Sequence, residues 1–141
     1  MANLINLENV SKTWGLKTLL DEVSLGVQTG DRIGVVGLNG GGKTTLLEVL
    51  TGIEPPDTGR VSHTNGLRMA VVTQRFTLPD EVTVGQAVVE PLGLEVFEWA
   101  SNAKVREVLA GTGVADLGLD TPVGQLSGGE RRRVNLAAAL V

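Results

Sequence analysis

A glycine-rich run in the first third of the chain has the residue types and spacing needed to bind phosphate. Residues 37–44 read GLNGGGKT and satisfy the pattern G-x-x-x-x-G-K-[ST]. Glycines let backbone N–H groups converge on a polyanion because no Cβ stands in the way. We expect Lys43 to reach the β- and γ-phosphates of a nucleotide and the Thr44 hydroxyl to ligate Mg²⁺. The alternative is that Gly40 to Gly42 form only a flexible turn, but chance would place the pattern in only about one per cent of such chains.

A second glycine pair lies in the sequence LSGGE, residues 126–130. Ser127 and Glu130 have the S-x-x-E spacing of a helix capping box, so we expect Ser127 to begin a helix. Glycines at the next two positions would each cost that helix up to about 1 kcal/mol relative to alanine. Their presence therefore suggests that a ligand approaches closely.

The phosphate pattern requires a strand before the loop and a helix after it. Residues 32–36 end in apolar side chains and predict a buried strand, and residues 43–50 have helical spacing and end before Gly52. Further upstream, residues 4–10 and 23–27 predict half-buried antiparallel strands. The expected fold class is therefore α/β.

The rest of the chain changes in character after Gln74. Before it, residues 60–63 and 67–73 are strand-like and flank the hairpin pair Asn65-Gly66. Beyond it, helices are expected, with a capping box at Thr83 and with Ser101 capping a helix that Gly111 closes.

Composition limits the possible partners. Apolar residues make up 42% of the 141 residues, which is enough for a core, and cysteine is absent, which excludes disulfides and thiolate metal sites. A net charge of −4 with 3% aromatics gives no support for a direct nucleic-acid site. The start, MANLINLENV, does not read as a secretory signal, and no apolar run reaches membrane-spanning length. We therefore expect a cytoplasmic location, peripheral to the membrane if the chain serves a transporter.

Three segments together resemble the ATP-binding-cassette (ABC) ATPase family. GLNGGGKTT looks like its phosphate loop, Thr73-Gln74 like its Q-loop, and LSGGE like its signature, and their order and separation fit across essentially the whole chain. The resemblance implies a P-loop NTPase fold with an antiparallel β-subdomain and nucleotide-binding core over residues 1–74. It also implies a helical subdomain over 75–126 and the start of the signature helix over 127–141. The implied ligands are ATP and Mg²⁺.

The resemblance also implies roles for single residues. Trp14, in SKTWG, matches the aromatic residue that stacks on adenine, although it could instead be a core tryptophan beside a strand. Gln74 resembles the residue that joins the Mg²⁺ and the attacking water, so it is expected to be a metal ligand with Thr44 and catalytic with Lys43. The residues expected to bind the nucleotide are Trp14, Gly37, Asn39, Gly40, Gly41, Gly42, Lys43, Thr44 and Thr45.

The signature is expected to act on a second molecule. In the family, residues matching Ser127, Gly128 and Gly129 contact the γ-phosphate held by the opposite domain of a head-to-tail dimer. The physical basis is a helix N-terminus aimed at an anion. A second cassette is therefore the expected partner.

The residues after the signature suggest a branch of the family. Glu130 followed by Arg131 to Arg133 resembles the ABC-F branch, whose soluble tandem cassettes act in translation and antibiotic resistance. We favour a ribosome-associated ABC-F ATPase on this basis. The arginines could also be a solvated helix face, and two alternatives stay open: the nucleotide-binding subunit of a membrane transporter, and a non-enzymatic remnant.

Several family motifs lie outside these 141 residues. Cassettes of the family continue into an apolar strand ending in Asp-Glu (the Walker B motif), a D-loop and a switch histidine. The only histidine here, His63, precedes the signature and is expected to be surface structure, and Val141 falls within a predicted helix. We therefore expect these 141 residues to be an incomplete domain that binds ATP without hydrolysing it alone.

Overall fold

The computed structural model describes residues 2–73 and 78–141 and divides the chain into two compact units. The first unit is Met1–Met69 and the second is Ala70–Val141. Each has its own hydrophobic core. The boundary expected from the sequence, after Gln74, lies outside the described residues.

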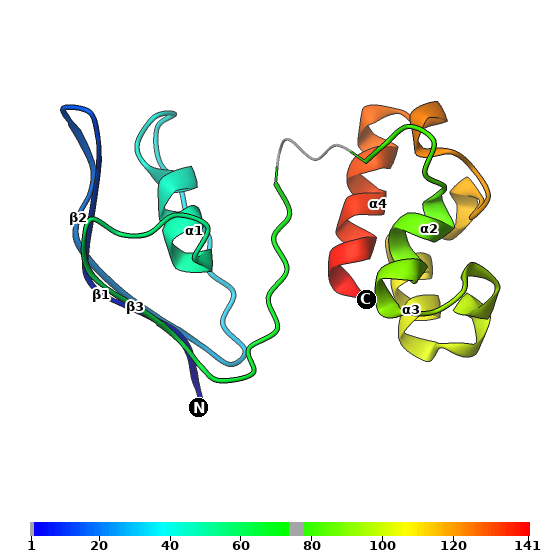
Figure 1. The fold of residues 1–141 in the computed structure, drawn as a ribbon, viewed down its shortest axis with the longest axis horizontal. Coiled ribbons are helices and arrows are strands. Elements are labelled where there is room, and N and C mark those ends of the chain that lie inside the picture. The colour runs from blue at the N-terminus through cyan, green and yellow to red at the C-terminus, as the bar shows by residue number, and fades with distance from the viewer. Residues whose placement is uncertain (1, 74–77) are drawn as a thin grey trace. The chain divides into compact units, whose positions relative to one another are not determined.

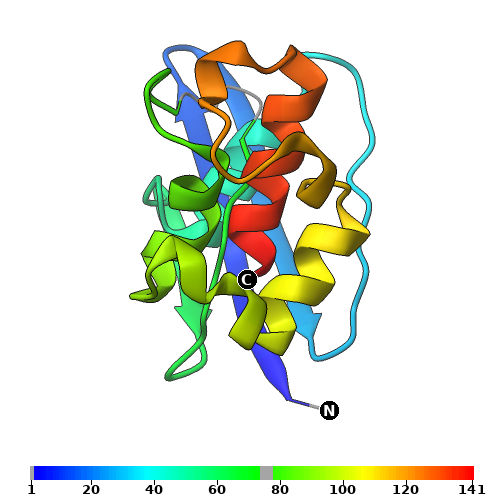
Figure 2. The same ribbon diagram turned by 90° about the vertical axis from the view of Figure 1, so that its right-hand side faces the viewer.

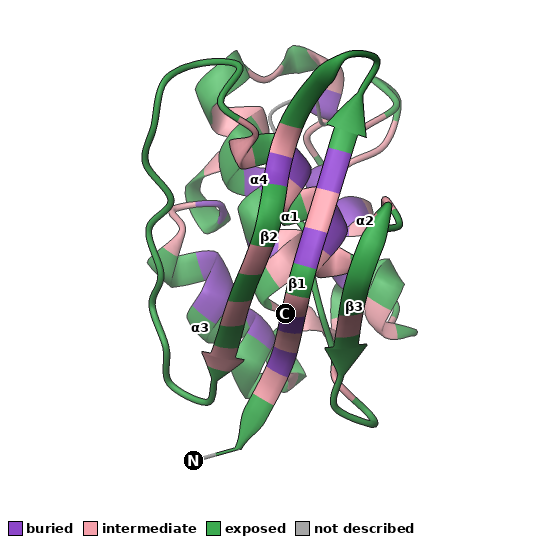
Figure 3. Ribbon diagram, turned by 90° about the vertical axis from the view of Figure 1, so that its left-hand side faces the viewer, coloured by how far each residue is buried: buried purple, intermediate pink, exposed green. Residues whose placement is uncertain are grey.

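The first unit is an antiparallel sheet covered by one helix. Strands β1 (Asn3–Trp14), β2 (Lys17–Gln28) and β3 (Thr58–His63) pair in the order β2-β1-β3 (Figure 1). Buried and exposed positions alternate along β1, as expected for a strand with one face on a core (Figure 3). The core of this unit consists of Ile5, Leu7, Val10 and Leu20 from the sheet and Val49 from the helix. The antiparallel strands predicted within residues 4–10 and 23–27 are confirmed, and both extend further.

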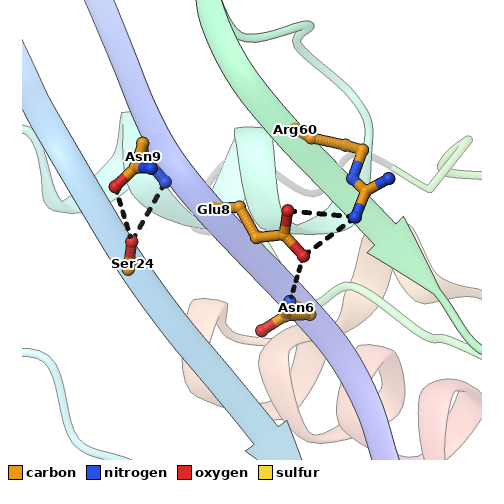
Figure 4. Close-up of polar contacts among 5 residues, drawn as sticks. All are labelled: Asn6, Glu8, Asn9, Ser24 and Arg60. Atoms are coloured by element: carbon orange, nitrogen blue, oxygen red, sulfur yellow. Dashed lines mark hydrogen bonds and ion pairs between the residues drawn. The ribbon is translucent and has the colours of Figure 1, made fainter.

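Side chains maintain the sheet where its ladder is irregular. The pairing of β1 with β2 shifts in register between Leu7 and Val10, and Asn9 adopts a positive φ of 49° there. The Asn9 N–H donates to Ser24 Oγ at 3.0 Å, and the Ser24 hydroxyl donates to Asn9 Oδ1 at 3.3 Å (Figure 4). The first bond gives the Asn9 N–H a partner where the ladder is irregular, and the second orients the Ser24 hydroxyl that accepts it.

A cross-strand ion pair joins the other two strands. Arg60 of β3 donates to both carboxylate oxygens of Glu8 at 3.0 Å, and the Asn6 amide donates to Glu8 Oε1 at 2.8 Å (Figure 4). Both partners of the ion pair are largely exposed, so its contribution is small. Glu8 and Arg60 are opposed in the register of β1 and β3, so the ion pair forms directly across the ladder.

Two predicted strands are wrong. Residues 32–36, the strand expected before the glycine loop, and residues 67–73 belong to no strand in the described residues, so the loop adjoins a helix but no strand there. Apolarity indicates where a strand could be buried, but a strand also requires a hydrogen-bonded neighbour, which the pattern does not supply. The expected burial is absent too, since Ile33 is 51% and Val36 93% exposed. Ile33 and Val35 instead line an apolar groove of about 230 Å³ with β2 and the helix that follows the loop.

Helix α1 (Lys43–Thr51) confirms the predicted helix after the glycine loop. It ends at Gly52, whose left-handed backbone donates its N–H to the Val49 carbonyl. His63 lies at the end of β3, where its Nε2 is 2.8 Å from the Leu50 carbonyl oxygen. This contact fits the structural role expected for His63.

The second unit is helical. Its α-helices are α2 (Val84–Val89), α3 (Ala103–Gly111) and α4 (Gly128–Leu140), joined by 3₁₀ turns η1 (Glu90–Leu92), η2 (Val96–Ser101), η3 (Ala115–Leu117) and η4 (Val123–Gln125) (Figure 2). Val84 and Val88 of α2, Val105 and Leu109 of α3 and Val134 of α4 form the centre of its core. The capping box predicted at Thr83 is present.

The predicted cap of α3 is wrong by one residue. Asn102, not Ser101, caps this helix, and its Oδ1 accepts the Val105 N–H at 3.1 Å. Ser101 belongs to η2 and donates its hydroxyl to the Glu98 carbonyl at 2.7 Å. Serine and asparagine are both good N-caps, and the two are adjacent here, so the sequence did not indicate which of them would cap α3. Gly111 is the last helical residue, and Thr112 follows as the C-cap.

Candidate nucleotide-binding site

The glycine loop holds a lysine ammonium at the start of α1. Lys43 Nζ donates to the Gly37 carbonyl at 2.6 Å and to the Leu38 carbonyl at 2.9 Å, and the Gly41 N–H closes the loop on Leu38 at 3.0 Å. An ammonium has three N–H donors, so these two bonds leave one for another acceptor. The loop therefore presents an oriented cation beside the helix N-terminus.

Gly42 is required by the packing of the first unit. Its φ is 93°, and a Cβ built on it would lie 2.7 Å from the Leu19 carbonyl oxygen in β2. As the N-cap of α1 it provides no side-chain acceptor, so no side chain caps the N–H groups of the first turn. Unpartnered donors at a helix N-terminus, next to a fixed ammonium, are suited to bind an anion.

The hydroxyl residues after Lys43 differ in their surroundings. Thr44 is exposed, like Asn39 and Gly40 in the loop, whereas Thr45 is only 7% exposed. No group of three or more histidine or carboxylate side chains in residues 2–73 and 78–141 could hold a metal ion. The Mg²⁺ contact expected of Thr44 stays a prediction; its exposed hydroxyl is a kind of ligand that this ion accepts alongside phosphate oxygens and water. Gln74, the other expected metal ligand and catalytic residue, lies outside the described residues.

The β1–β2 hairpin contacts the glycine loop through a lysine next to an aromatic residue. Trp14, the last residue of β1, pairs with Lys17, the first of β2, and Lys17 Nζ donates to the Gly40 carbonyl at 2.8 Å. Trp14 is 52% exposed, which does not fit the alternative of a core tryptophan. The hairpin therefore connects the candidate base-stacking residue to the candidate phosphate site. Nothing in the sequence marked Lys17 as the connecting residue.

Ser127 caps α4 in the second unit, as predicted. Its backbone N–H donates to Glu130 Oε1 at 2.9 Å, and its hydroxyl accepts the Glu130 N–H at 3.3 Å. The bonds from the Ser127 N–H and hydroxyl, followed by the charge of Arg133, lower the pKa of Glu130. Ser127, Gly128 and Gly129 are all exposed.

The two signature glycines have no packing reason to be glycine. A Cβ built on Gly128 or Gly129 would have no described neighbour within 4 Å, and neither residue has a positive φ. Both still carry the cost of glycine in a helix. The fold of the second unit does not account for this pair.

The arginines after the signature do not form a single free surface. Arg131 donates to the Gly124 carbonyl at 3.0 Å and to the Leu126 carbonyl at 3.3 Å, and it lies 3.8 Å from Asp80 Oδ1. Arg132 and Arg133 are exposed. Arg131 therefore stabilises the turn before α4 rather than remaining available to a partner.

None of the helices that the structure describes is long and apolar enough to cross a membrane.

The chain matches known proteins over most of its length. A family model described as "ABC transporter" matches residues 20–141. The zinc import ATP-binding protein ZnuC of Roseobacter denitrificans is 37% identical over 143 aligned residues, which cover 99% of this chain and 52% of that protein. The energy-dependent translational throttle protein EttA of Haemophilus influenzae is 36% identical, over 97% of this chain and 25% of that protein.

A solved structure described as the ATP-binding subunit of an ABC transporter superposes with a TM-score of 0.78 at 22% identity, covering 96% of this chain and 61% of that one. This likeness shows the fold. The chain spans about half the length of the import proteins it matches. The family match over residues 20–141, with the loop and helix geometry above, shows that the chain belongs to the ABC transporter family of ATP-binding domains and has its P-loop NTPase fold.

Proposed function

We propose that this chain binds Mg-ATP as part of the ATPase subunit of an ABC import transporter. The proposal departs from the ABC-F assignment that the sequence favoured, because similar proteins include import ATP-binding proteins named for zinc, hemin, spermidine/putrescine and sulfate/thiosulfate. Such a subunit would lie on the cytoplasmic side, against separate transmembrane subunits. The transported substrate is left open by these relatives, since their named substrates differ.

The geometry of Lys43 is the observation that carries the proposal. Its ammonium is held by two loop carbonyls at the start of α1, beside helix N–H groups without a side-chain cap. A triphosphate would add charge-assisted hydrogen bonds to the remaining donor and to the loop N–H groups. Thr44 would supply a hydroxyl to Mg²⁺, and Trp14 would stack on the adenine.

Hydrolysis is proposed to require a second cassette in a head-to-tail dimer. Ser127, Gly128 and Gly129 form an exposed helix N-terminus whose glycines have no packing role among the described residues of the second unit. We infer that the absence of Cβ atoms there lets the γ-phosphate held by the other cassette approach the first turn of α4. In this arrangement Ser127 would not serve the nucleotide bound at Lys43 of its own chain.

The test is equilibrium binding of Mg-ATP to the chain and to its Lys43→Ala variant, measured by titration calorimetry. Hydrogen bonds to charged groups contribute roughly 1.5–3 kcal/mol, so the variant should bind about 10- to 150-fold more weakly. Lys104→Ala is the matched control, because it removes an exposed lysine from α3 in the second unit. Circular dichroism of each variant checks that the helices and sheet are retained. Equal affinities of folded wild type and Lys43→Ala would refute nucleotide binding at this loop.

A ribosome-associated ABC-F protein is the second candidate. The match to the translational throttle protein, at 36% identity over 97% of this chain, is the observation in its favour. The arginine run adds less than the sequence suggested, because Arg131 is bound within the second unit. Sequencing the gene beyond codon 141 separates the two proposals. A second cassette after a charged helical linker supports ABC-F, and a single cassette beside genes for membrane proteins supports the transporter.

A further inference from the structure

Lys12 of β1 is a buried lysine that the proposed function does not yet use. It is 8% exposed, although lysine is rarely buried without compensation. Its ammonium donates to the Pro55 carbonyl at 2.9 Å and lies 3.4 Å from Asp57 Oδ1 and 3.7 Å from Glu54 Oε2. It also lies 5.5 Å from the centroid of the Trp14 ring, within cation–π range.

The acidic partner of Lys12 is itself held in place. Asp57 Oδ2 accepts the Thr13 N–H at 2.8 Å and the Thr13 hydroxyl at 3.0 Å, and the Asp57 N–H donates to the Ser11 carbonyl at 2.9 Å. The loop before β3 is therefore fastened to the three residues that precede Trp14. These contacts fix the backbone from which the indole ring projects.

The strand that carries the indole ring is connected both to this fastened loop and to the phosphate loop. The Lys12 ammonium lies near the Trp14 ring. Across the hairpin, Trp14 pairs with Lys17, whose ammonium donates to the Gly40 carbonyl. Trp14 nevertheless keeps 52% of its surface exposed. An exposed ring would sample several rotamers unless a neighbour favoured one of them.

We propose that Lys12, held by Asp57, is a positioning residue that orients the Trp14 ring to receive the base of the nucleotide. The proposal rests on the proposed function, since it concerns the same ATP site. Lys12 acts through Trp14 and does not contact the phosphates. Its loss should therefore weaken binding of the base and leave binding of the phosphate chain unchanged.

The experiment compares two ligands, Mg-ATP and Mg-tripolyphosphate, which share the phosphate chain but not the base. Their affinities are measured on the full chain and on Lys12→Met, Lys12→Arg and, as the matched control, Lys104→Met. We expect Lys12→Met to weaken Mg-ATP about 3- to 10-fold, the range of one cation–π contact, with tripolyphosphate unchanged. Lys12→Arg should restore most of the ATP affinity, because it keeps the cation.

A spectroscopic measurement reports on the ring itself. Trp14 and Trp99 are the only tryptophans, so a Trp99→Phe background makes the fluorescence specific to Trp14. Lys12→Met should increase the quenching of Trp14 by acrylamide, an uncharged quencher, and reduce the fluorescence change caused by ATP. Should Lys12→Met fail to fold, the exposed Asp57→Asn variant provides the same ligand comparison.

The outcomes separate this proposal from the one on which it rests. Equal weakening of Mg-ATP and tripolyphosphate in Lys12→Met and Asp57→Asn would overturn the positioning role, because it would indicate general damage to the unit. Unchanged ATP affinity in the folded variants would overturn it as well. Failure of the wild-type chain to bind either ligand would instead refute the phosphate site.

Discussion

Replacing Gly42 with alanine tests whether the phosphate loop and the sheet are one packed structure. The substitution has two costs. Alanine at a left-handed φ of 93° costs about 1–2 kcal/mol. The new Cβ would also lie 2.7 Å from the Leu19 carbonyl oxygen, a backbone atom that cannot rotate away, and forced overpacking costs typically about 1–3 kcal/mol. We therefore expect Gly42→Ala to destabilise the first unit by about 2–5 kcal/mol.

Gly66→Ala is the matched control for the backbone term. Gly66 also has a positive φ, 75°, but a Cβ there would have no neighbour within 4 Å among the described residues. It should therefore lose only about 1–2 kcal/mol. Urea unfolding followed by Trp14 fluorescence, in the Trp99→Phe background, reports on the first unit and gives both values.

The difference in destabilisation between Gly42→Ala and Gly66→Ala shows whether the loop is packed against β2. Gly42→Ala should cost about 1–3 kcal/mol more than Gly66→Ala, and it should also weaken Mg-ATP binding because the loop must move away from β2. Costs equal to within about 0.5 kcal/mol, the error of such comparisons, would refute the idea that the loop is packed against Leu19.

Two further predictions concern the α4 cap and the loop before β3. Ser127→Ala should destabilise α4 by about 0.5–2 kcal/mol, whereas Ser127→Asp should keep the cap. Amide hydrogen exchange over residues 128–140 measures the stability of the helix in both variants. Equal protection in the two variants would show that the side-chain cap is unimportant. Hydrogen bonds from the Thr13 N–H and hydroxyl, together with Lys12, lower the pKa of Asp57. The ionised carboxylate therefore stabilises the native state at neutral pH. This stabilisation is lost as the pH falls from the usual aspartate pKa of about 3.9 through the lower native pKa. Asp57→Asn should therefore lower the melting temperature more at pH 7 than near pH 3, and an equal decrease at both would contradict this linkage.

The local parts of the fold could be predicted from the sequence. Helix α1, the antiparallel pair β1 and β2, and the capping boxes at Thr83 and Ser127 all depend on patterns within a few residues. Residues 32–36 show the limit of such patterns. Their apolar side chains indicate burial, but whether they form a strand depends on a hydrogen-bonded neighbour, which no local pattern contains.

The candidate site was predictable to a similar extent. The glycine pattern located Lys43 and Thr44, because that chemistry requires those residue types in a fixed order. Lys12 and Lys17 were not found, since a single lysine in a strand or turn has no distinctive spacing. Their roles come from contacts with residues 55–57 and Gly40, which are far away in the sequence.

The two glycine motifs should respond differently if a descendant of this protein lost its nucleotide. Gly42 would persist under selection for folding alone, because any side chain there meets the Leu19 carbonyl. Gly128 and Gly129 have open space around them in the described part of the second unit, so substitutions that favour a helix could accumulate there once no ligand excluded them. An intact Gly42 would then be a poor marker of retained activity in such a lineage. Substitution of Gly128 or Gly129 would be the earlier sign that nucleotide binding had been lost.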